Sequence, residues 1–184
     1  RRSYLKYPYM DILGNFYGEF VKYGGSDGNS LGIVLTPRHI TNLMCELIDI
    51  NENDYVLDPC CGSGGFLIAA MNKMLNQTTD ESKQAQIKQK QLHGIELQQK
   101  LFTIATTNMI LRGDGKSNLK RDDIFHVGKD FYTDKITKAL INPPYSQAKT
   151  KNLSHLSEIS FINETLSLMK SGAKLAAIVP QSTM

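Results

Sequence analysis

The sequence has no tryptophan, only three cysteines among 184 residues, and no apolar run long enough for a membrane span. A helix that crosses a bilayer needs about 18–20 consecutive apolar residues. The cysteines are Cys45, Cys60 and Cys61, and no Cys-x-x-Cys pair is present. We therefore expect neither a disulfide framework nor a zinc site, and the four scattered histidines do not suggest another bound metal. This cysteine usage favours a reducing compartment, so we expect a cytoplasmic protein with no membrane partner.

A strong net charge is also absent, because the formal charge is only +3 at pH 7. Such a balance permits nucleic acid as a partner without requiring it. We expect one catalytic domain over residues 31–184, incomplete at its C-terminal end, where the sequence stops just after an apolar run. Residues 1–30 are expected to hold a helix over about 10–23 and a Gly-rich linker over 24–30.

Apolar segments with strand character alternate with helical patterns along the catalytic domain. This alternation predicts an α/β fold with a mostly parallel sheet and helices on both faces. The predicted strands are 55–57, 92–96, 118–121, 139–142 and 174–179. The predicted helices are 36–48, 65–75, 98–112 and 157–170, and the polar stretch 76–91 is an exposed helix or an insertion.

Helical spacing also predicts which faces of these helices are buried. Thr36 is expected to cap the first helix, with Pro37 at its first helical position. Its predicted apolar stripe is Ile40, Leu43, Met44, Leu47 and Ile48. The predicted stripe of the last helix is Ile159, Ile162, Leu166 and Met169.

Acidic side chains follow the first three predicted strands. Asp58 opens a turn rich in small residues, Asp58-Pro-Cys-Cys-Gly-Ser-Gly-Gly-Phe66, and Glu96 ends the second strand. In a parallel sheet these residues share one edge, where ligands bind. Asp58 would attract a cation or an amine, Glu96 suits the paired hydroxyls of a ribose, and Asp122 or Asp123 could accept from an adenine amine.

The glycine pattern of the first turn excludes two common nucleotide sites. It is neither Gly-x-Gly-x-x-Gly nor a P-loop, because no Gly-Lys-Ser/Thr follows. The carboxylate of Asp58 would also repel phosphates. The distance in sequence from Asp58 to Glu96 exceeds the ~20 residues typical of dinucleotide folds, and the polar stretch 76–91 can account for the excess.

The fourth predicted strand ends in Asn142-Pro143-Pro144-Tyr145. Neither proline has a backbone N–H, and each fixes its own φ, so the loop is stiff. Asn142 precedes a proline and is pushed toward an extended conformation. The loop offers one amide side chain, carbonyl oxygens and one aromatic ring, which suits it to hold a planar group with an exocyclic amine.

On these residues, the chain resembles the amino-methylating DNA methyltransferases. It is most similar to the modification subunits of type I restriction systems and related fused enzymes, over about residues 10–184. The resemblance is carried by the segments 58–66 and 142–145, by Gly94-Ile-Glu96, and by Leu35-Thr-Pro-Arg38. Because Thr36-Pro37 precedes the Gly-rich turn, the motif order resembles the gamma type. The fold implied is the Rossmann-like fold of S-adenosylmethionine-dependent methyltransferases.

The resemblance implies a bacterial or archaeal enzyme that transfers a methyl group from S-adenosylmethionine to the N6 amine of adenine in DNA. The implied catalytic residues are Asn142, Pro143, Pro144 and Tyr145, with the tyrosine stacking on a flipped base. The implied cofactor-binding residues are Thr36, Pro37, Asp58, Pro59, Cys60, Gly62, Gly64, Phe66, Glu96 and Asp123. The family pattern at the third strand end is Gly-Asp-x-Leu/Phe, whereas this chain has Asp122-Asp123-Ile-Phe125. Matching the final aromatic residue favours Asp123 over Asp122 as the adenine ligand.

Two other functions are compatible with the sequence. Asn-Pro-Pro-Tyr also occurs in methyltransferases that act on protein glutamine or on RNA, and a silent scaffold could bind DNA or a partner without catalysis. No recognition domain, helix-turn-helix pattern or dense basic patch is evident. We therefore expect double-stranded DNA as substrate, and a specificity subunit or a fused target-recognition domain to choose the site. The resemblance also allows a restriction subunit as a further partner.

Overall fold

The structure is a computed structural model, and it describes residues 35–113, 118–129, 132–144 and 157–183. Several sequence predictions therefore lie outside the described residues. These are the helix over 10–23, the linker over 24–30, the ring of Tyr145 and the polar stretch over 146–156. The proposed boundary between residues 30 and 31 stays a prediction.

Five parallel strands form one sheet, in the order β3-β2-β1-β4-β5. The chain moves outward from β1 to β3, crosses back to place β4 on the other side of β1, and adds β5 beyond it. The strand order thus reverses between β1 and β4, which is where open α/β sheets bind ligands. The strands are β1 Val56–Asp58, β2 Leu92–Ile95, β3 Asn118–Lys120, β4 Lys138–Ile141 and β5 Lys174–Ala177.

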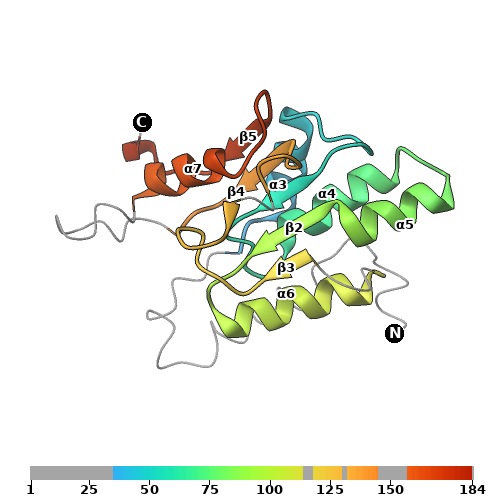
Figure 1. Cartoon of the computed structure of the whole chain (residues 1–184), viewed down its shortest axis with the longest axis horizontal. Helices are drawn as coiled ribbons and strands as arrows, with labels where there is room; N and C mark the ends of the chain where they lie inside the picture. Colours follow the sequence, from blue (N-terminus) through green and yellow to red (C-terminus); the bar gives the residue numbers. More distant parts are fainter. Residues whose placement is uncertain (1–34, 114–117, 130–131, 145–156, 184) are drawn as a thin grey trace.

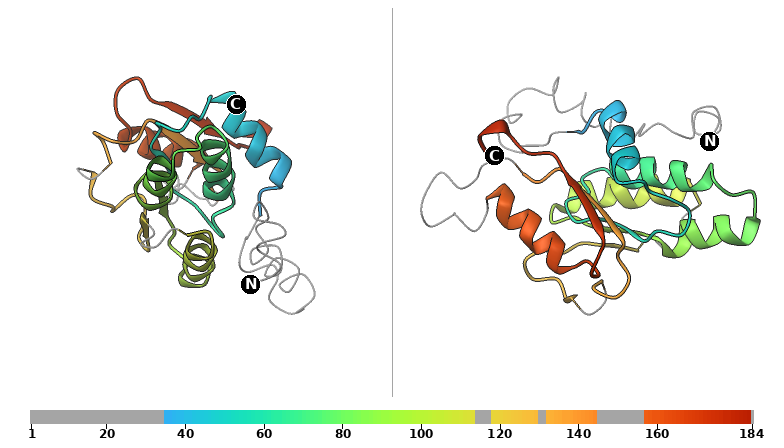
Figure 2. Two further views of the ribbon diagram at one scale, coloured as in Figure 1. Left: turned by 90° about the vertical axis from the view of Figure 1, so that its right-hand side faces the viewer. Right: turned by 90° about the horizontal axis from the view of Figure 1, so that it is seen from above.

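Helices cover both faces of this sheet, as the alternating pattern predicts. Figure 1 shows α6 beside β3 at one end of the sheet and α7 beside β4 and β5 at the other. Figure 2 shows α3 and α4 on one side of β4 and β5, with α7 on the opposite side. The helices are α3 Arg38–Leu47, α4 Gly65–Leu75, α5 Glu81–Lys90, α6 Gln99–Leu111 and α7 Glu158–Ser167, with a short 3-10 turn at Gln181–Thr183.

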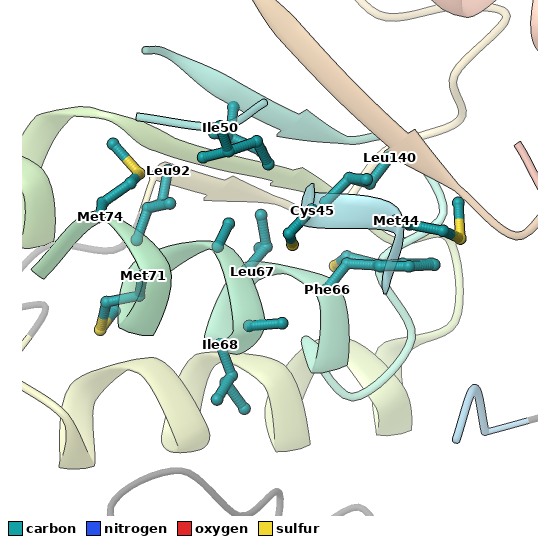
Figure 3. Close-up of a cluster of buried hydrophobic side chains, with 14 of the residues drawn as sticks. Met44, Cys45, Ile50, Phe66, Leu67, Ile68, Met71, Met74, Leu92 and Leu140 are labelled. Atoms are coloured by element: carbon teal, nitrogen blue, oxygen red, sulfur yellow. The ribbon is translucent and has the colours of Figure 1, made fainter. Parts of the chain in front are cut away.

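The larger hydrophobic core lies between the sheet and α4. α4 buries residues on nearly every side, so its buried positions are not confined to one stripe: Phe66, Leu67, Ile68, Ala69, Ala70, Met71 and Met74. Met44 and Cys45 of α3 close the core from one side, and Leu92 and Leu140 contribute from the strands (Figure 3). This packing fixes α4, and with it the turn that joins α4 to β1.

A second core covers the opposite face of the sheet. Phe161, Leu168 and Met169, from α7 and the turn after it, pack against Leu57 and other buried residues of the strands and of the segment 121–137. Phe125 and Phe161 meet edge to face, with ring centroids 4.9 Å apart. The described residues Ile124, Val127, Tyr132 and Ile136, which lie between β3 and β4, therefore contribute to this core together with α7.

The predicted buried stripe of α3 is partly wrong. Leu43 and Leu47 are 51% and 70% exposed, whereas the helix buries Thr41, Met44 and Cys45. The buried set keeps helical spacing but is rotated by about one residue from the leucines. α3 packs against α4, and Cys45 is smaller than leucine, so it allows closer approach of the two helices.

The predicted stripe of α7 is likewise only partly wrong, since Met169 is buried and Ile162 is half-buried as expected. Ile159 and Leu166 are exposed, and the helix instead buries Glu158, Phe161 and Thr165. The hydroxyl of Thr165 donates to the carbonyl of Phe161 at 2.7 Å, which satisfies it inside the core. A polar residue can therefore occupy the buried face when its own helix supplies the acceptor.

The polar stretch 76–91 contains a helix of its own, α5, whose only buried residue is Ile87. It lies between α4 and β2 and lengthens the chain between Asp58 and Glu96. The predicted strands and helices are otherwise found within a few residues of their expected bounds. No helix among the described residues is both long and apolar enough to cross a bilayer.

Gly94 in β2 gives a stability prediction. A Cβ there would lie 2.4 Å from Leu119 Cδ2, 2.9 Å from Leu67 Cδ1 and 3.1 Å from Cys61 Sγ. Gly94→Ala should therefore force repacking and lower the free energy of unfolding by about 1–3 kcal/mol. Urea denaturation measures this.

Gly128→Ala is the matched control, because a Cβ at Gly128 meets no described atom within 4 Å. Equal urea midpoints for the two variants would contradict close packing at Gly94.

Candidate active site

Four polar side chains meet at the carboxyl edge of the sheet, beside the reversal of strand order. Asp58 is the last residue of β1, Glu96 directly follows β2, and Asn142 directly follows β4. Asp123 follows β3 by three residues. The strand-end residues predicted from the sequence are therefore brought to one edge, with Asp58 and Asn142 on adjacent strands.

Asp58 is completely buried, and one of its carboxyl oxygens is unsatisfied. Oδ1 accepts from the N–H of Cys60 at 3.2 Å, whereas Oδ2 has no partner among the described residues. Burial raises the pKa of Asp58 well above its ordinary value of 3.8, the Cys60 N–H opposes this, and the charge of Glu96 adds to it. Oδ2 therefore lacks a donor, which a ligand amine would provide.

The Gly-rich turn after β1 is held in place by backbone and side-chain hydrogen bonds. Gly62 N donates to Glu96 Oε2 at 2.9 Å, and Cys61 N donates to the carbonyl of Ile95 at 2.9 Å. Gly64 caps α4 in a left-handed conformation, with φ of +89°. A Cβ on Gly64 would lie 3.7 Å from Ala105 Cβ, so this glycine faces α6. Its conformation, more than the approach of a ligand, accounts for glycine at this position.

Glu96 joins the turn to the second strand. Besides Gly62, it accepts from the N–H of Gln98, at 2.7 Å through Oε1. Burial raises the pKa of this carboxyl, and the backbone N–H donors of Gln98, Gly62 and Leu97 act in the opposite direction. Each carboxylate oxygen can accept a second hydrogen bond, so Glu96 can also accept from paired hydroxyls.

Asp122 and Asp123 have different surroundings. Asp122 forms an ion pair with Lys120 at 3.1 Å, and the hydrogen bond from Lys120 lowers its pKa. Asp123 accepts from the N–H of Phe125 at 3.0 Å and lies 3.3 Å from Nδ1 of His126. Asp123, unlike Asp122, also acts on the thiol of Cys60. The assignment of Asp123, and not Asp122, as the residue that contacts a ligand adenine stays a prediction.

Cys60 marks the point where the acidic groups converge. Burial raises the pKa of its thiol well above 9.0, and the charges of Asp58, Glu96 and Asp123 raise it further. Burial also raises the pKa of the Cys61 thiol, and the charges of Asp58 and Glu96 raise it further. Both residues are therefore thiols at neutral pH and poor nucleophiles. The described residues contain no group of three or more side chains suited to hold a metal ion.

Asn142 has a half-satisfied amide. Its Nδ2 donates to Thr36 Oγ1 at 3.0 Å, and its Oδ1 is buried with no partner in the described part of the chain. Thr36 is not the N-cap of α3, although the sequence predicts it. The N-cap is Pro37 and the helix begins at Arg38, so that prediction is wrong by one position. Pro143 is buried, Pro144 is half-buried, and Tyr145 lies beyond the described residues.

Two more of the predicted residues lie in the turn and at the start of α4. Pro59 and Phe66 are buried, and Phe66 belongs to the larger core, so its packing explains it without a ligand. Pro37 is exposed at the start of α3.

Asn108 contributes to the site and is missed by the sequence analysis. It is completely buried in α6, and its Nδ2 donates to the carbonyl of Ser63 in the Gly-rich turn at 2.9 Å. The available signal in the sequence was the position of this asparagine, one helical turn after Ala105 on the apolar face of α6, which indicates a buried amide. Buried amides are retained where they satisfy a specific backbone group.

Comparison with known proteins identifies the family. The family model described as N-6 DNA Methylase matches residues 9–178. The chain belongs to the N-6 DNA methylase family. This confirms the resemblance seen in the strand-end motifs.

Relatives of this N-6 DNA methylase chain include two curated restriction proteins. It is 65% identical over 176 residues to the type II restriction enzyme and methyltransferase RM.BcgI of Heyndrickxia coagulans, covering 95% of this chain and 28% of that protein. It is 27% identical to the type I restriction enzyme EcoEI methylase subunit of Escherichia coli, covering 73% of this chain and 27% of the subunit. The chain thus spans about a quarter of the length of these relatives.

A solved structure of the type I R-M system matches with a TM-score of 0.75 and 21% identity, over 93% of this chain and 37% of that one. This likeness confirms the predicted Rossmann-like methyltransferase fold.

Proposed function

We propose that this chain is the catalytic region of an enzyme that transfers a methyl group from S-adenosylmethionine to the N6 amine of adenine in DNA. One observation carries the proposal: two buried acceptors, Asp58 Oδ2 and Asn142 Oδ1, lack partners among the described residues. They end the adjacent strands β1 and β4. Unsatisfied buried acceptors are costly, so their presence at one ligand-binding edge indicates bound donors.

The side chains at the ends of β1, β2 and β3 fit the methyl donor. Asp58 Oδ2 would accept from its ammonium group, Glu96 from its ribose hydroxyls, and Asp123 from its adenine amine. The sulfonium of the bound donor supplies an electrophilic methyl group. Family membership and the unsatisfied Asp58 together support this assignment.

The end of β4 fits the acceptor base. An exocyclic aromatic amine is a weak nucleophile, because its lone pair is delocalised into the ring. Asn142 Oδ1 and the Pro143 carbonyl would accept its two hydrogens and favour a pyramidal nitrogen. These hydrogen bonds strengthen as positive charge develops on the nitrogen, so they stabilise the transition state over the ground state.

The acceptor base must reach this edge from outside the DNA stack. Its amine points into the duplex, so we propose that the base is flipped out before transfer. Tyr145 would stack on the flipped ring, a contact worth ~1–3 kcal/mol. Attack on the methyl group is then an in-line displacement, for which positioning supplies much of the rate. The raised pKa values of Cys60 and Cys61 agree with a mechanism that uses no covalent intermediate.

We further propose that another domain or subunit selects the DNA site. Two curated relatives are named as a restriction enzyme and methyltransferase and as a methylase subunit, and this chain matches about a quarter of each. A fused target-recognition domain or a specificity subunit would supply the sequence reading that the strand-end residues lack.

A labelled methyl group distinguishes the candidate functions. The intact protein, with any subunits that copurify, would be incubated with methyl-labelled S-adenosylmethionine in three separate reactions. These would contain double-stranded DNA, RNA or protein as the acceptor. We expect label in DNA alone. Label only in RNA or protein would favour the alternative methyltransferases, and no label in any acceptor would favour the scaffold.

The titration of Asp58 predicts how donor affinity depends on pH. Burial raises the pKa of Asp58 from 3.8, so the free protein binds extra protons and loses stability as pH rises above about 4. A ligand ammonium pairs with the ionised form, so affinity for the donor should rise with pH as Asp58 ionises. The increase should stop near pH 8, where an α-amino group loses its own proton.

Calorimetry with S-adenosylmethionine at pH 5.5, 6.5 and 7.5 measures this dependence. Asp58→Asn should bind more weakly and remove most of the pH dependence. Asp134→Asn, an exposed carboxylate shortly before β4, is the control and should behave as the unmodified protein. An unchanged pH profile in Asp58→Asn would show that Asp58 does not meet the ammonium group.

A further inference from the structure

Thr36 and Asn142 are 106 positions apart in sequence, yet their side chains form a hydrogen bond. Asn142 Nδ2 donates to Thr36 Oγ1 at 3.0 Å. Thr36 lies just before α3, and the N–H groups of Ile40 and Thr41 in its first turn donate to the carbonyl of Pro37. Within the described chain, no side chain caps this helix. The hydroxyl of Thr36 therefore serves Asn142 instead of the helix end.

The two ends of an asparagine amide have opposite hydrogen-bonding character. The oxygen accepts, whereas the nitrogen only donates. If the amide were rotated by 180°, Nδ2 would face the substrate amine, and two donors would meet. Something must therefore select the orientation in which Oδ1 faces the base.

We infer that Thr36 is the positioning residue that makes this selection, by accepting from Nδ2 and leaving Oδ1 for the substrate. The inference rests on the proposed function, because it takes Oδ1 as the acceptor of the adenine amine. Oδ1 is buried and unpartnered among the described residues, as the selected orientation requires. Once Oδ1 binds the substrate amine, Nδ2 needs an acceptor of its own, and Thr36 Oγ1 is within reach.

Thr36 is well placed for this task because its backbone is restrained. Pro37 follows it and favours an extended conformation at Thr36. α3 begins one residue later, and its residues Met44 and Cys45 are buried in the larger core against α4. Thr36 thus lies two residues before a helix that is anchored in the core. This anchoring restrains the position of its hydroxyl, as precise placement of a reacting group requires.

This role differs from the cofactor-binding role that the family resemblance implies for Thr36. A residue that binds the donor should change the affinity for the donor. A residue that orients Asn142 should change kcat and leave donor affinity nearly unchanged. The two roles are therefore separable by measurement.

The test uses Thr36→Val, which keeps the shape of the side chain and removes the hydroxyl, and Thr36→Ser, which keeps the hydroxyl. We expect Thr36→Val to lower kcat by about 10-fold to 100-fold, because a displaced catalytic group loses rate steeply. Donor affinity by calorimetry should stay within about twofold. Thr36→Ser should recover most of the lost rate. In the Asn142→Ala background, Thr36→Val should have no further effect on kcat.

Thr107→Val is the matched control, because its exposed hydroxyl donates only within α6, to Thr103, among the bonds described. It should leave kcat unchanged. Thr36→Ala replaces Thr36→Val if the latter unfolds at the assay temperature.

Three outcomes would overturn the inference. They are an unchanged kcat in Thr36→Val, a weakened donor affinity with normal kcat at saturation, and equal loss in Thr36→Val and Thr36→Ser. A native protein that binds the donor but methylates no DNA would instead reject the proposed function, and the inference with it.

Discussion

Replacing Asn142 with alanine should lower the rate of methyl transfer to DNA by a factor of about 10²–10³, with donor affinity within about twofold of normal. The change removes Oδ1, the acceptor that is buried and unsatisfied among the described residues. Its hydrogen bond to the amine is strongest when the nitrogen carries positive charge, so the loss falls on kcat. Single-turnover assays and calorimetry with the donor measure the two quantities separately.

Asn142→Asp is the informative companion variant. It keeps an acceptor oxygen at the same position, and the hydroxyl of Thr36 can donate to its other oxygen. It should therefore retain more activity than Asn142→Ala. Parallel losses of kcat and of donor affinity in Asn142→Ala would instead indicate a structural role for the residue.

Replacing Glu96 with alanine should weaken donor binding by about 10²-fold, with kcat at saturating donor much less affected. Glu96 holds the N–H groups of Gly62 and Gln98 at 2.9 and 2.7 Å and would also accept from the ribose. Hydrogen bonds to charged groups contribute about 1.5–3 kcal/mol each, and one such bond to the ligand accounts for about tenfold to 10²-fold.

Glu81→Ala provides the control for this prediction, since Glu81 is exposed in the first turn of α5. It should bind the donor normally. Glu96→Gln should fall between Glu96→Ala and the native protein, because its amide keeps one acceptor oxygen. If Glu96→Ala bound the donor with normal affinity, Glu96 would support only the turn and not the ligand.

The positions of the strands along the chain could be predicted because most buried strands are short apolar runs ended by a distinctive polar residue. Val56–Asp58 and Lys138–Ile141 are each buried along their length, and Asp58 and Asn142 mark where they end. In a parallel sheet the strand ends share an edge, so the motifs alone were sufficient to bring together Asp58, Glu96 and Asn142.

The buried faces of the helices could not be predicted as well. In α3, Leu43 and Leu47 are the most hydrophobic candidates, yet the helix buries Thr41 and Cys45. Hydrophobic spacing measures the character of a helix, whereas burial depends on which neighbour covers it and how close that neighbour lies. Cys45 is buried because α4 packs against it, and this contact is not encoded in the local pattern.

The hydrogen bonds that orient the side chains of the site also could not be predicted from the sequence. The bond between Thr36 and Asn142 joins residues 106 positions apart, and the bond between Asn108 and Ser63 joins residues 45 positions apart. Thr36 has a conventional helix-capping sequence, and only the fold shows that its hydroxyl is used elsewhere. Motifs thus predict the groups that would meet the ligands, and the structure shows which residues hold those groups in place.

The identity of the methylated base shows whether Asn142 presents its oxygen to the amine of an adenine. DNA from cells expressing the intact protein, or its Asn142→Ala variant, would be digested to nucleosides and analysed by mass spectrometry. We expect N6-methyl-2′-deoxyadenosine with the native protein and none above background with the variant. Methylation of cytosine alone, or equal methylated adenine with both proteins, would contradict it.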